Sequence, residues 1–139
     1  MKIIVETIVN APIEKVWYTY NAPEHIVNWN AASEDWHTTY PSVDLRVGGQ
    51  FSSRMEAKDG SFGFDFAGSY TKVVENTLIE YSFGERTVQV GFLFTPKGVK
   101  VRVKFESEET HSIEQQQQGW QAILNNFTRY VEETNSAKM

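Results

Sequence analysis

The stretch over residues 48–70 constrains the fold most, because it predicts a β-hairpin whose pairing can be counted residue by residue. Asp59-Gly60 is a preferred pair for the tight turns that match the twist of two antiparallel strands. Counting outward from this turn places Met55 opposite Phe64, and a longer loop over residues 58–61 gives the same pairing. The register of the hairpin therefore does not depend on which turn forms.

The two faces of this hairpin differ in chemistry. One face collects aromatic side chains and a methionine, and we call it the aromatic wall: Phe51, Met55, Phe62, Phe64 and Phe66. The opposite face carries Arg54, Glu56 and Asp65, which would suit acid–base chemistry if they lay inside a cavity. The register instead pairs Arg54 with Asp65 on the outside, where a cross-strand ion pair contributes about 0.2–1 kcal/mol. We therefore predict that the aromatic wall faces inward and that the charges join the strands from outside.

The bulk properties of the chain restrict its class. A length of 139 residues predicts a single domain over residues 1–139, and the absence of cysteine excludes disulfides, thiolate catalysis and cysteine-bound metals. A net charge of -5 argues against a nucleic-acid surface. Glu6 and Pro12 interrupt the N-terminal segment, so it lacks the continuous apolar run of a signal peptide. No apolar stretch of about 18 residues, the length of a membrane-spanning helix, occurs in the sequence. We expect a cytoplasmic protein without nucleic-acid or membrane partners.

Alternation of apolar and polar residues predicts further strands, which cover residues 3–9, 36–40, 79–83, 88–94 and 99–105. Gly84-Glu85 suits a tight turn with glycine at its first central position. Two short helices are expected after the first strand. Asn10 is a suitable N-cap for one of them, with Pro12 in its first turn, and Pro23 opens the other.

The last predicted helix is long and amphipathic. Ser112 and Gln115 match a capping box, and the helix continues to about Glu133. Its apolar stripe comprises Trp120, Ile123, Leu124, Phe127 and Val131. The glutamines at 115–118 predict a solvated helical turn. Gly119 costs about 1 kcal/mol in mid-helix, which predicts close approach of a strand or a ligand at this point.

The order of these elements predicts an α+β fold. A curved antiparallel sheet of about six or seven strands wraps around the long C-terminal helix and buries its apolar stripe. Two short helices after strand one complete the arrangement. A strongly bent sheet lined by large side chains need not close on one helix, so this layering can leave a cavity.

Four parts of the sequence carry a family resemblance. They are residues 10–17 (NAPIEKVW), the tripeptides at 28–30 and 35–37, the hairpin at 48–70, and residues 118–124 (QGWQAIL) with Phe127. Together they resemble the activator of heat-shock-protein ATPase homologue family, which belongs to the START-like, birch-pollen-allergen-like SRPBCC superfamily. The resemblance implies a helix-grip fold. Eukaryotic activators of this kind carry a separate N-terminal domain that engages the chaperone, for which 139 residues leave no room.

No sequence motif points to catalysis or to a metal. His25, His37 and His111 lack the spacing of a metal site, and no serine lies in a nucleophile-elbow motif. His37 neighbours Trp36 in an irregular segment, and its role stays open between structural and catalytic. We predict no catalytic residue, no metal and no cofactor.

Three functions remain open from the sequence. The first is a binding module for a small hydrophobic or aromatic molecule held between the sheet and the last helix. Its candidate ligand-contacting residues are Trp17, Trp29, Trp36, His37, Met55, Phe64, Phe66, Tyr81, Trp120, Leu124 and Phe127. The second is an enzyme of the cyclase or aromatase type that acts on a polyketide-like substrate through His37, or through Arg54 if the register is wrong. The third is an interaction protein that stimulates a chaperone ATPase.

Overall fold

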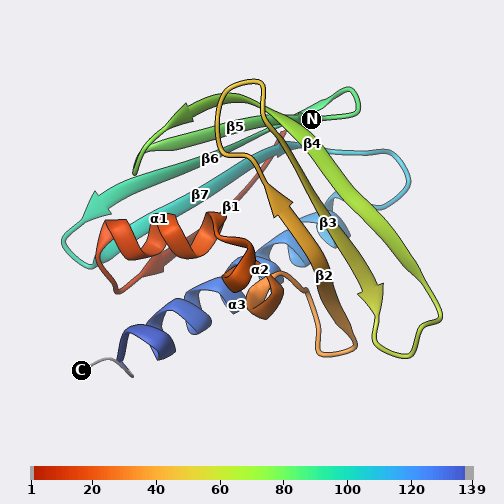
Figure 1. The fold of residues 1–139 in the computed structure, drawn as a ribbon, viewed down its shortest axis with the longest axis horizontal. Helices are drawn as coiled ribbons and strands as arrows, with labels where there is room; N and C mark the ends of the chain where they lie inside the picture. The colour runs from red at the N-terminus through yellow and green to blue at the C-terminus, as the bar shows by residue number, and fades with distance from the viewer. Residues whose placement is uncertain (1, 137–139) are drawn as a thin grey trace.

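Seven antiparallel strands form one curved sheet in the computed structural model, which describes residues 2–136. The strands are β1 (Lys2–Val9), β2 (Trp36–Val43), β3 (Gln50–Ala57), β4 (Gly63–Val74), β5 (Leu78–Phe83), β6 (Arg86–Thr95) and β7 (Gly98–Glu106). The helices are α1 (Ile13–Asn21), α2 (Pro23–Trp29) and α3 (Ile113–Ser136). The strand order β1-β7-β6-β5-β4-β3-β2 and the long last helix confirm the predicted α+β helix-grip class (Figure 1).

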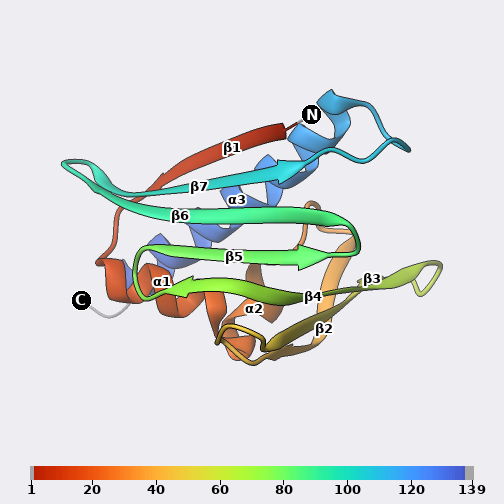
Figure 2. The same cartoon turned by 90° about the horizontal axis from the view of Figure 1, so that it is seen from above.

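The sheet curves around α3, with α1 and α2 on the same side. Figure 2 shows the strands next to one another from β1 to β2, with the helices behind them. The hydroxyls of Thr7 and Thr128 share a hydrogen bond of 2.6 Å, and the backbone N–H of Asn10 donates to the Glu132 carboxylate at 2.8 Å. These bonds tie α3 to the edge strand β1. Within residues 2–136, no helix combines the length and the apolar character needed to span a membrane.

The hydrophobic core lies between the concave face of the sheet and α3. In β7, the predicted alternation is confirmed, because Val99, Val101, Val103 and Phe105 are all buried. The apolar stripe of α3 meets this face through Leu124, Phe127 and Val131, which are also buried. Burial of branched and aromatic side chains on both layers supplies most of the stabilisation of such a fold.

The β3–β4 hairpin has the predicted register. Met55 pairs with Phe64, and Arg54 pairs with Asp65. The connection is the longer of the two alternatives, since the backbone N–H of Ala57 donates to the carbonyl of Phe62 at 2.9 Å. The β5–β6 hairpin also matches its prediction: Gly84 takes a φ of 58°, which glycine adopts without steric cost at the first central position of this turn.

The start of α1 differs from its prediction. Asn10 does not cap the helix, because α1 begins at Ile13 and Pro12 occupies the N-cap position without a side-chain hydrogen bond. Asn10 therefore lies too far upstream to reach the first turn. At α3 the capping box is confirmed: Gln115 N–H donates to the Ser112 hydroxyl at 3.1 Å, and Ser112 N–H donates to the Gln115 side-chain oxygen at 3.2 Å.

One further expectation for α3 was wrong, and another is confirmed only in part. A Cβ added at Gly119 would meet nothing within 4 Å, so no strand or side chain approaches this glycine closely. Gln115, Gln117 and Gln118 are exposed, as predicted for a solvated turn, but Gln116 is buried. Its side-chain amide donates to the Glu108 carbonyl at 3.1 Å, and its oxygen accepts from the Glu108 N–H at 2.8 Å. Gln116 thus joins the first turn of α3 to the segment that follows β7.

Candidate functional site

A cavity of about 230 Å³ lies between the concave face of the sheet and the helices. Side chains from every helix and from five of the strands line it. The lining residues are Tyr20, Asn21, Ile26, Trp29, Asn30, Val43, Phe51, Ser53, Met55, Phe64, Phe66, Tyr70, Ile79, Tyr81, Val103, Trp120, Ile123 and Leu124. Most of them are aromatic or aliphatic, as in pockets that hold apolar molecules.

Contacts between aromatic rings hold one side of the cavity in shape. Trp120 stacks on Phe105 of β7, with ring centroids 4.1 Å apart and an interplanar angle of 14°. Phe66 meets Trp120 edge-on at 6.3 Å, and Phe51 contacts Phe66 at 5.7 Å. Each ring therefore rests on a neighbour and does not lie across the open volume.

Seven of the predicted ligand-contacting residues come together around this cavity. They are Trp29, Met55, Phe64, Phe66, Tyr81, Trp120 and Leu124. Met55, Phe64 and Phe66 reach it through the register of β3 and β4, and Trp120 and Leu124 through the helical stripe of α3, both of which are local properties of the sequence. Trp29 comes from α2 and Tyr81 from β5. That they contact a ligand stays a prediction.

The other four predicted residues lie away from the cavity. Trp17 and Phe127 are core residues: Trp17 packs on Phe92 at 5.2 Å, and Phe127 is fully buried against Trp29 at 4.9 Å. Trp36 and His37 lie on β2 and line a separate, polar surface cleft with α2 and α3. Periodicity places these side chains on an apolar stripe or strand, but it does not distinguish a position packed in the core from one that borders a cavity.

The aromatic wall is divided along its length, which corrects the prediction that all five members face inward. Phe51, Met55 and Phe66 lie over the cavity, whereas Phe62 is 62% exposed. Phe64 is intermediate, since it lines the cavity and is also 43% exposed. The β3–β4 hairpin projects beyond the helices at its tip, so the same face of the ribbon meets solvent there (Figures 1 and 2).

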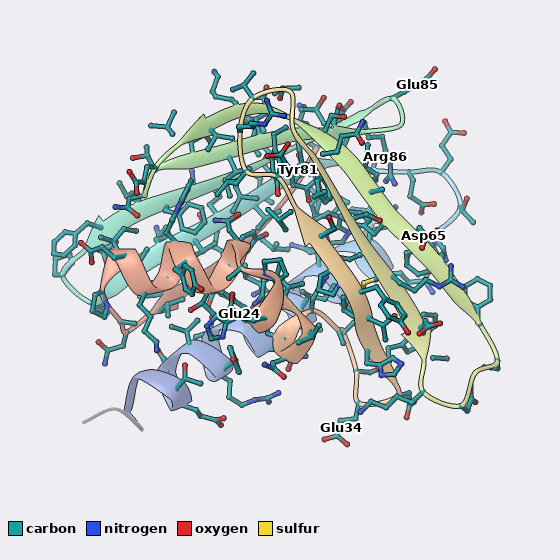
Figure 3. The ribbon with its side chains drawn as sticks, in the orientation of Figure 1. Glu24, Glu34, Asp65, Tyr81, Glu85 and Arg86 are labelled. Carbon is teal, nitrogen blue, oxygen red and sulfur yellow. The ribbon has the colours of Figure 1, made fainter. Side chains whose placement is uncertain are left out.

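The charged cluster lies outside, as predicted. Arg54 Nη1 lies 3.4 Å from Asp65 Oδ1, and Arg54 Nε lies 3.5 Å from Glu56 Oε2. Figure 3 shows Asp65 on the outer side of β4. His37 Nε2 lies 3.9 Å from Glu56 Oε1, in the same outer group. The residues assigned to the cyclase or aromatase alternative therefore do not line the cavity.

The sequence analysis missed the polar groups of the cavity. Tyr20, Tyr70 and Asn21 line it alongside Tyr81, and the Asn21 amide donates to the Trp17 carbonyl at 2.9 Å. A signal was available for Tyr70, because the register of β4 and β5 places it directly opposite Tyr81. Within residues 2–136, no group of three or more histidine, cysteine or acidic residues is placed to hold a metal ion.

Comparison with known proteins identifies a family that the chain matches. Residues 10–132 match the family described as Activator of Hsp90 ATPase homolog 1-like protein. The chain is similar to the solution NMR structure of the AHSA1-like protein from Aeromonas hydrophila, with 49% identity, a TM-score of 0.90, and coverage of 96% of this chain and 94% of that chain. A protein from Cytophaga hutchinsonii is 48% identical, with a TM-score of 0.83 and coverage of 96% and 93%. A comparison with curated proteins found no match.

A crystal structure of a protein from Chromobacterium violaceum shares the fold at 23% identity, with a TM-score of 0.85 and coverage of 95% of this chain and 98% of that chain. The family match extends over most of the chain, and the first two relatives are nearly half identical over almost their whole length. The chain therefore belongs to the activator of Hsp90 ATPase homolog 1-like family and has its SRPBCC-type helix-grip structure.

Proposed function

We propose that this protein binds a small hydrophobic or aromatic molecule in the cavity between the sheet and α3. The observation that carries the proposal is the open volume of about 230 Å³ with mainly apolar walls. Ligand pockets combine such walls with a few polar groups that orient the ligand. The volume suits a monocyclic or bicyclic molecule, since an apolar protein cavity of about 150 Å³ accepts benzene.

An open apolar cavity lowers the stability of the folded protein. Core-truncation series give roughly 24 cal/mol for each Å³ of enclosed cavity, which sets an upper bound of about 5 kcal/mol on the cost of about 230 Å³. A ligand that fills the space restores the missing contacts and stabilises the folded state by mass action. This stabilisation supports the proposal that the volume is kept open for a bound molecule.

Filling the cavity tests the proposal. Ser53 is buried, lines the cavity and pairs with Phe66, so Ser53→Phe places a ring in the open volume. Ser52 points to the opposite face of the sheet, which makes Ser52→Phe a matched control. We expect monocyclic and bicyclic aromatic probes to bind the wild-type protein and Ser52→Phe, but not Ser53→Phe, in protein-observed NMR titrations. Wild-type affinity in Ser53→Phe would contradict the proposal, and native mass spectrometry of protein from its own host would identify a co-purifying ligand.

A second candidate function, stimulation of a chaperone ATPase, is favoured by the family's name and by one surface feature. Phe62 and Phe64 contact Trp36 at centroid distances of 5.9 and 6.1 Å and leave an aromatic patch exposed at the hairpin tip. Exposed apolar patches mark protein interaction sites. We expect the protein to raise the ATPase rate of its host's Hsp90-type chaperone, and Phe62→Ser to remove that rise.

Leu93→Ser is the matched control for this second candidate, because Leu93 is equally exposed but lies on β6, away from the patch. It should leave the stimulation unchanged. An ATPase rate that does not respond to micromolar wild-type protein would contradict this candidate and would leave the binding proposal unaffected.

A further inference from the structure

Three tyrosine side chains line the cavity from different elements. Tyr20 comes from α1, Tyr70 from β4 and Tyr81 from β5. Tyr70 and Tyr81 pair across the sheet with ring centroids 6.5 Å apart, and they are only 6% and 7% exposed. Figure 3 shows Tyr81 beneath the curve of the sheet. The fold thus brings three tyrosine side chains to one apolar space.

These hydroxyls have no hydrogen-bond partner in the described part of the chain. Every fully enclosed side-chain nitrogen or oxygen of residues 2–134 does have a partner, so the tyrosine oxygens must reach open space. A buried hydroxyl that makes no hydrogen bond costs about 1–3 kcal/mol. The hydrogen-bonding capacity of Tyr20, Tyr70 and Tyr81 is therefore available to a molecule in the cavity.

All three groups stay protonated at physiological pH. Burial, with a smaller effect from Asp44, raises the pKa of Tyr70 to about 12. Burial also raises the pKa of Tyr20 and Tyr81, and electrostatic interaction with the neighbouring tyrosines adds to the effect. Each group therefore meets a ligand as an O–H donor and not as a phenolate.

Ions are poorly matched to this cavity. No lining side chain carries a charge. The guanidinium of Arg86, the cation that acts on the pKa of Tyr81, lies 4.2 Å from the centroid of the Phe83 ring and donates to the Glu106 carbonyl at 3.5 Å. Moving a carboxylate from water into such a space without a cation costs several kcal/mol.

We propose that the cavity selects an uncharged molecule with an apolar, planar body and an oxygen that accepts hydrogen bonds, and that Tyr20, Tyr70 and Tyr81 are the specificity-determining donors. This inference rests on the proposed function, because it assigns chemistry to the ligand of the same cavity. The apolar body occupies the space beside Phe66 and Trp120, and the acceptor oxygen satisfies hydroxyls that the protein leaves without partners.

Three probes of equal size separate these features. Acetophenone carries an acceptor oxygen, α-methylstyrene replaces that oxygen by a methylene group, and benzoate replaces the methyl group of acetophenone by a charged oxygen. Dissociation constants are measured by NMR titration. We expect acetophenone to bind and benzoate to give no detectable binding. The deciding quantity is the ratio of the acetophenone and α-methylstyrene affinities, compared between wild-type and variant proteins.

Tyr→Phe substitutions remove each hydroxyl and keep each ring. In the triple variant Tyr20→Phe/Tyr70→Phe/Tyr81→Phe, the preference for acetophenone should fall by roughly three- to tenfold, and the α-methylstyrene affinity should stay within about twofold of wild type. Tyr18→Phe, on the exposed side of the same helix as Tyr20, is the matched control and should preserve the ratio. Because the cavity hydroxyls lack protein partners, the triple variant should unfold at no lower urea concentration than wild type. If the hydroxyls had a structural role, the variant would unfold at a lower urea concentration.

The results distinguish failure of the tyrosine assignment from failure of the proposed binding function. A ratio that the triple variant leaves unchanged, or benzoate binding as tight as acetophenone binding, would overturn the assignment of the tyrosines while leaving a cavity that binds apolar molecules. Failure of all three probes to bind would overturn the proposed function itself, and the assignment with it.

Discussion

The indole of Trp120 lies flat on the phenyl ring of Phe105, with centroids 4.1 Å apart and ring planes 14° apart. This contact joins α3 to β7 and holds the indole to one side of the cavity. Stacked aromatic pairs contribute about 0.5–1.5 kcal/mol beyond the area they bury. The pair therefore supports both the fold and the open volume beside it.

Truncation of this pair should be costly. Trp120→Ala removes a large ring from a partly buried position and should lower the free energy of unfolding by about 3–5 kcal/mol. Urea denaturation of Trp120→Ala, Phe105→Ala and the double variant gives the coupling energy between the rings. Strictly additive losses in the two single variants would show that the stacking itself contributes nothing.

The Arg54–Asp65 pair should contribute little. Both side chains are substantially exposed, and the atoms are 3.4 Å apart. Asp65→Asn keeps the shape of the side chain and should change the free energy of unfolding by less than about 1 kcal/mol. It should also leave aromatic probe binding intact, because the pair lies outside the cavity. A loss of probe binding in Asp65→Asn would contradict the outward placement of this cluster.

Gly119 should tolerate a side chain. A Cβ at this position meets nothing within 4 Å, so Gly119→Ala should stabilise α3 by about 0.5–1 kcal/mol through helix propensity. Gly98→Ala is the opposite case, since its φ is +140° and an added Cβ would lie 2.4 Å from the Val9 carbonyl oxygen. Thermal unfolding should therefore shift upward for Gly119→Ala and downward for Gly98→Ala. A downward shift for Gly119→Ala would reveal a contact that the fold does not show.

Stability should fall at alkaline pH. Burial raises the pKa of Tyr70 from 10.0 to about 12, and it raises the pKa of Tyr20 and Tyr81 as well. Above pH 10 the unfolded chain loses these protons first, so the folded state binds more protons and its stability decreases as pH rises. Each tyrosine contributes a slope of up to about 1.4 kcal/mol per pH unit in this window.

Urea denaturation between pH 9 and pH 12, in steps that bracket the ordinary tyrosine pKa of 10.0, measures this slope. The variants Tyr70→Phe and Tyr81→Phe should each give a shallower decline than wild type. Parallel declines in the wild-type and variant proteins would show that these tyrosines titrate alike in the folded and unfolded states.

Local patterns were sufficient to predict much of the fold. The pairings of Met55 with Phe64 and Arg54 with Asp65 follow from alternation around a short loop, because the side chains of a strand repeat every two residues. The capping box of Ser112 and Gln115 likewise depends on neighbours three residues apart. Asn10 failed as a cap for the same local reason, since the helix starts at Ile13 and beyond its reach.

The site depended on distances that no local pattern encodes. Phe62 and Phe66 share a face of one strand ribbon and the same chemistry, yet Phe66 contacts Trp120 of α3, whereas Phe62 is exposed. Trp17 and Phe127 fit apolar stripes as well as Trp29 does, but only Trp29 borders open space. The sequence by itself determined the strands, the long helix and most of the residues that face inward, because those follow from backbone periodicity. Only the tertiary structure decided where the inward side chains fail to meet, because a cavity of about 230 Å³ is the small remainder left when a curved sheet packs against a straight helix.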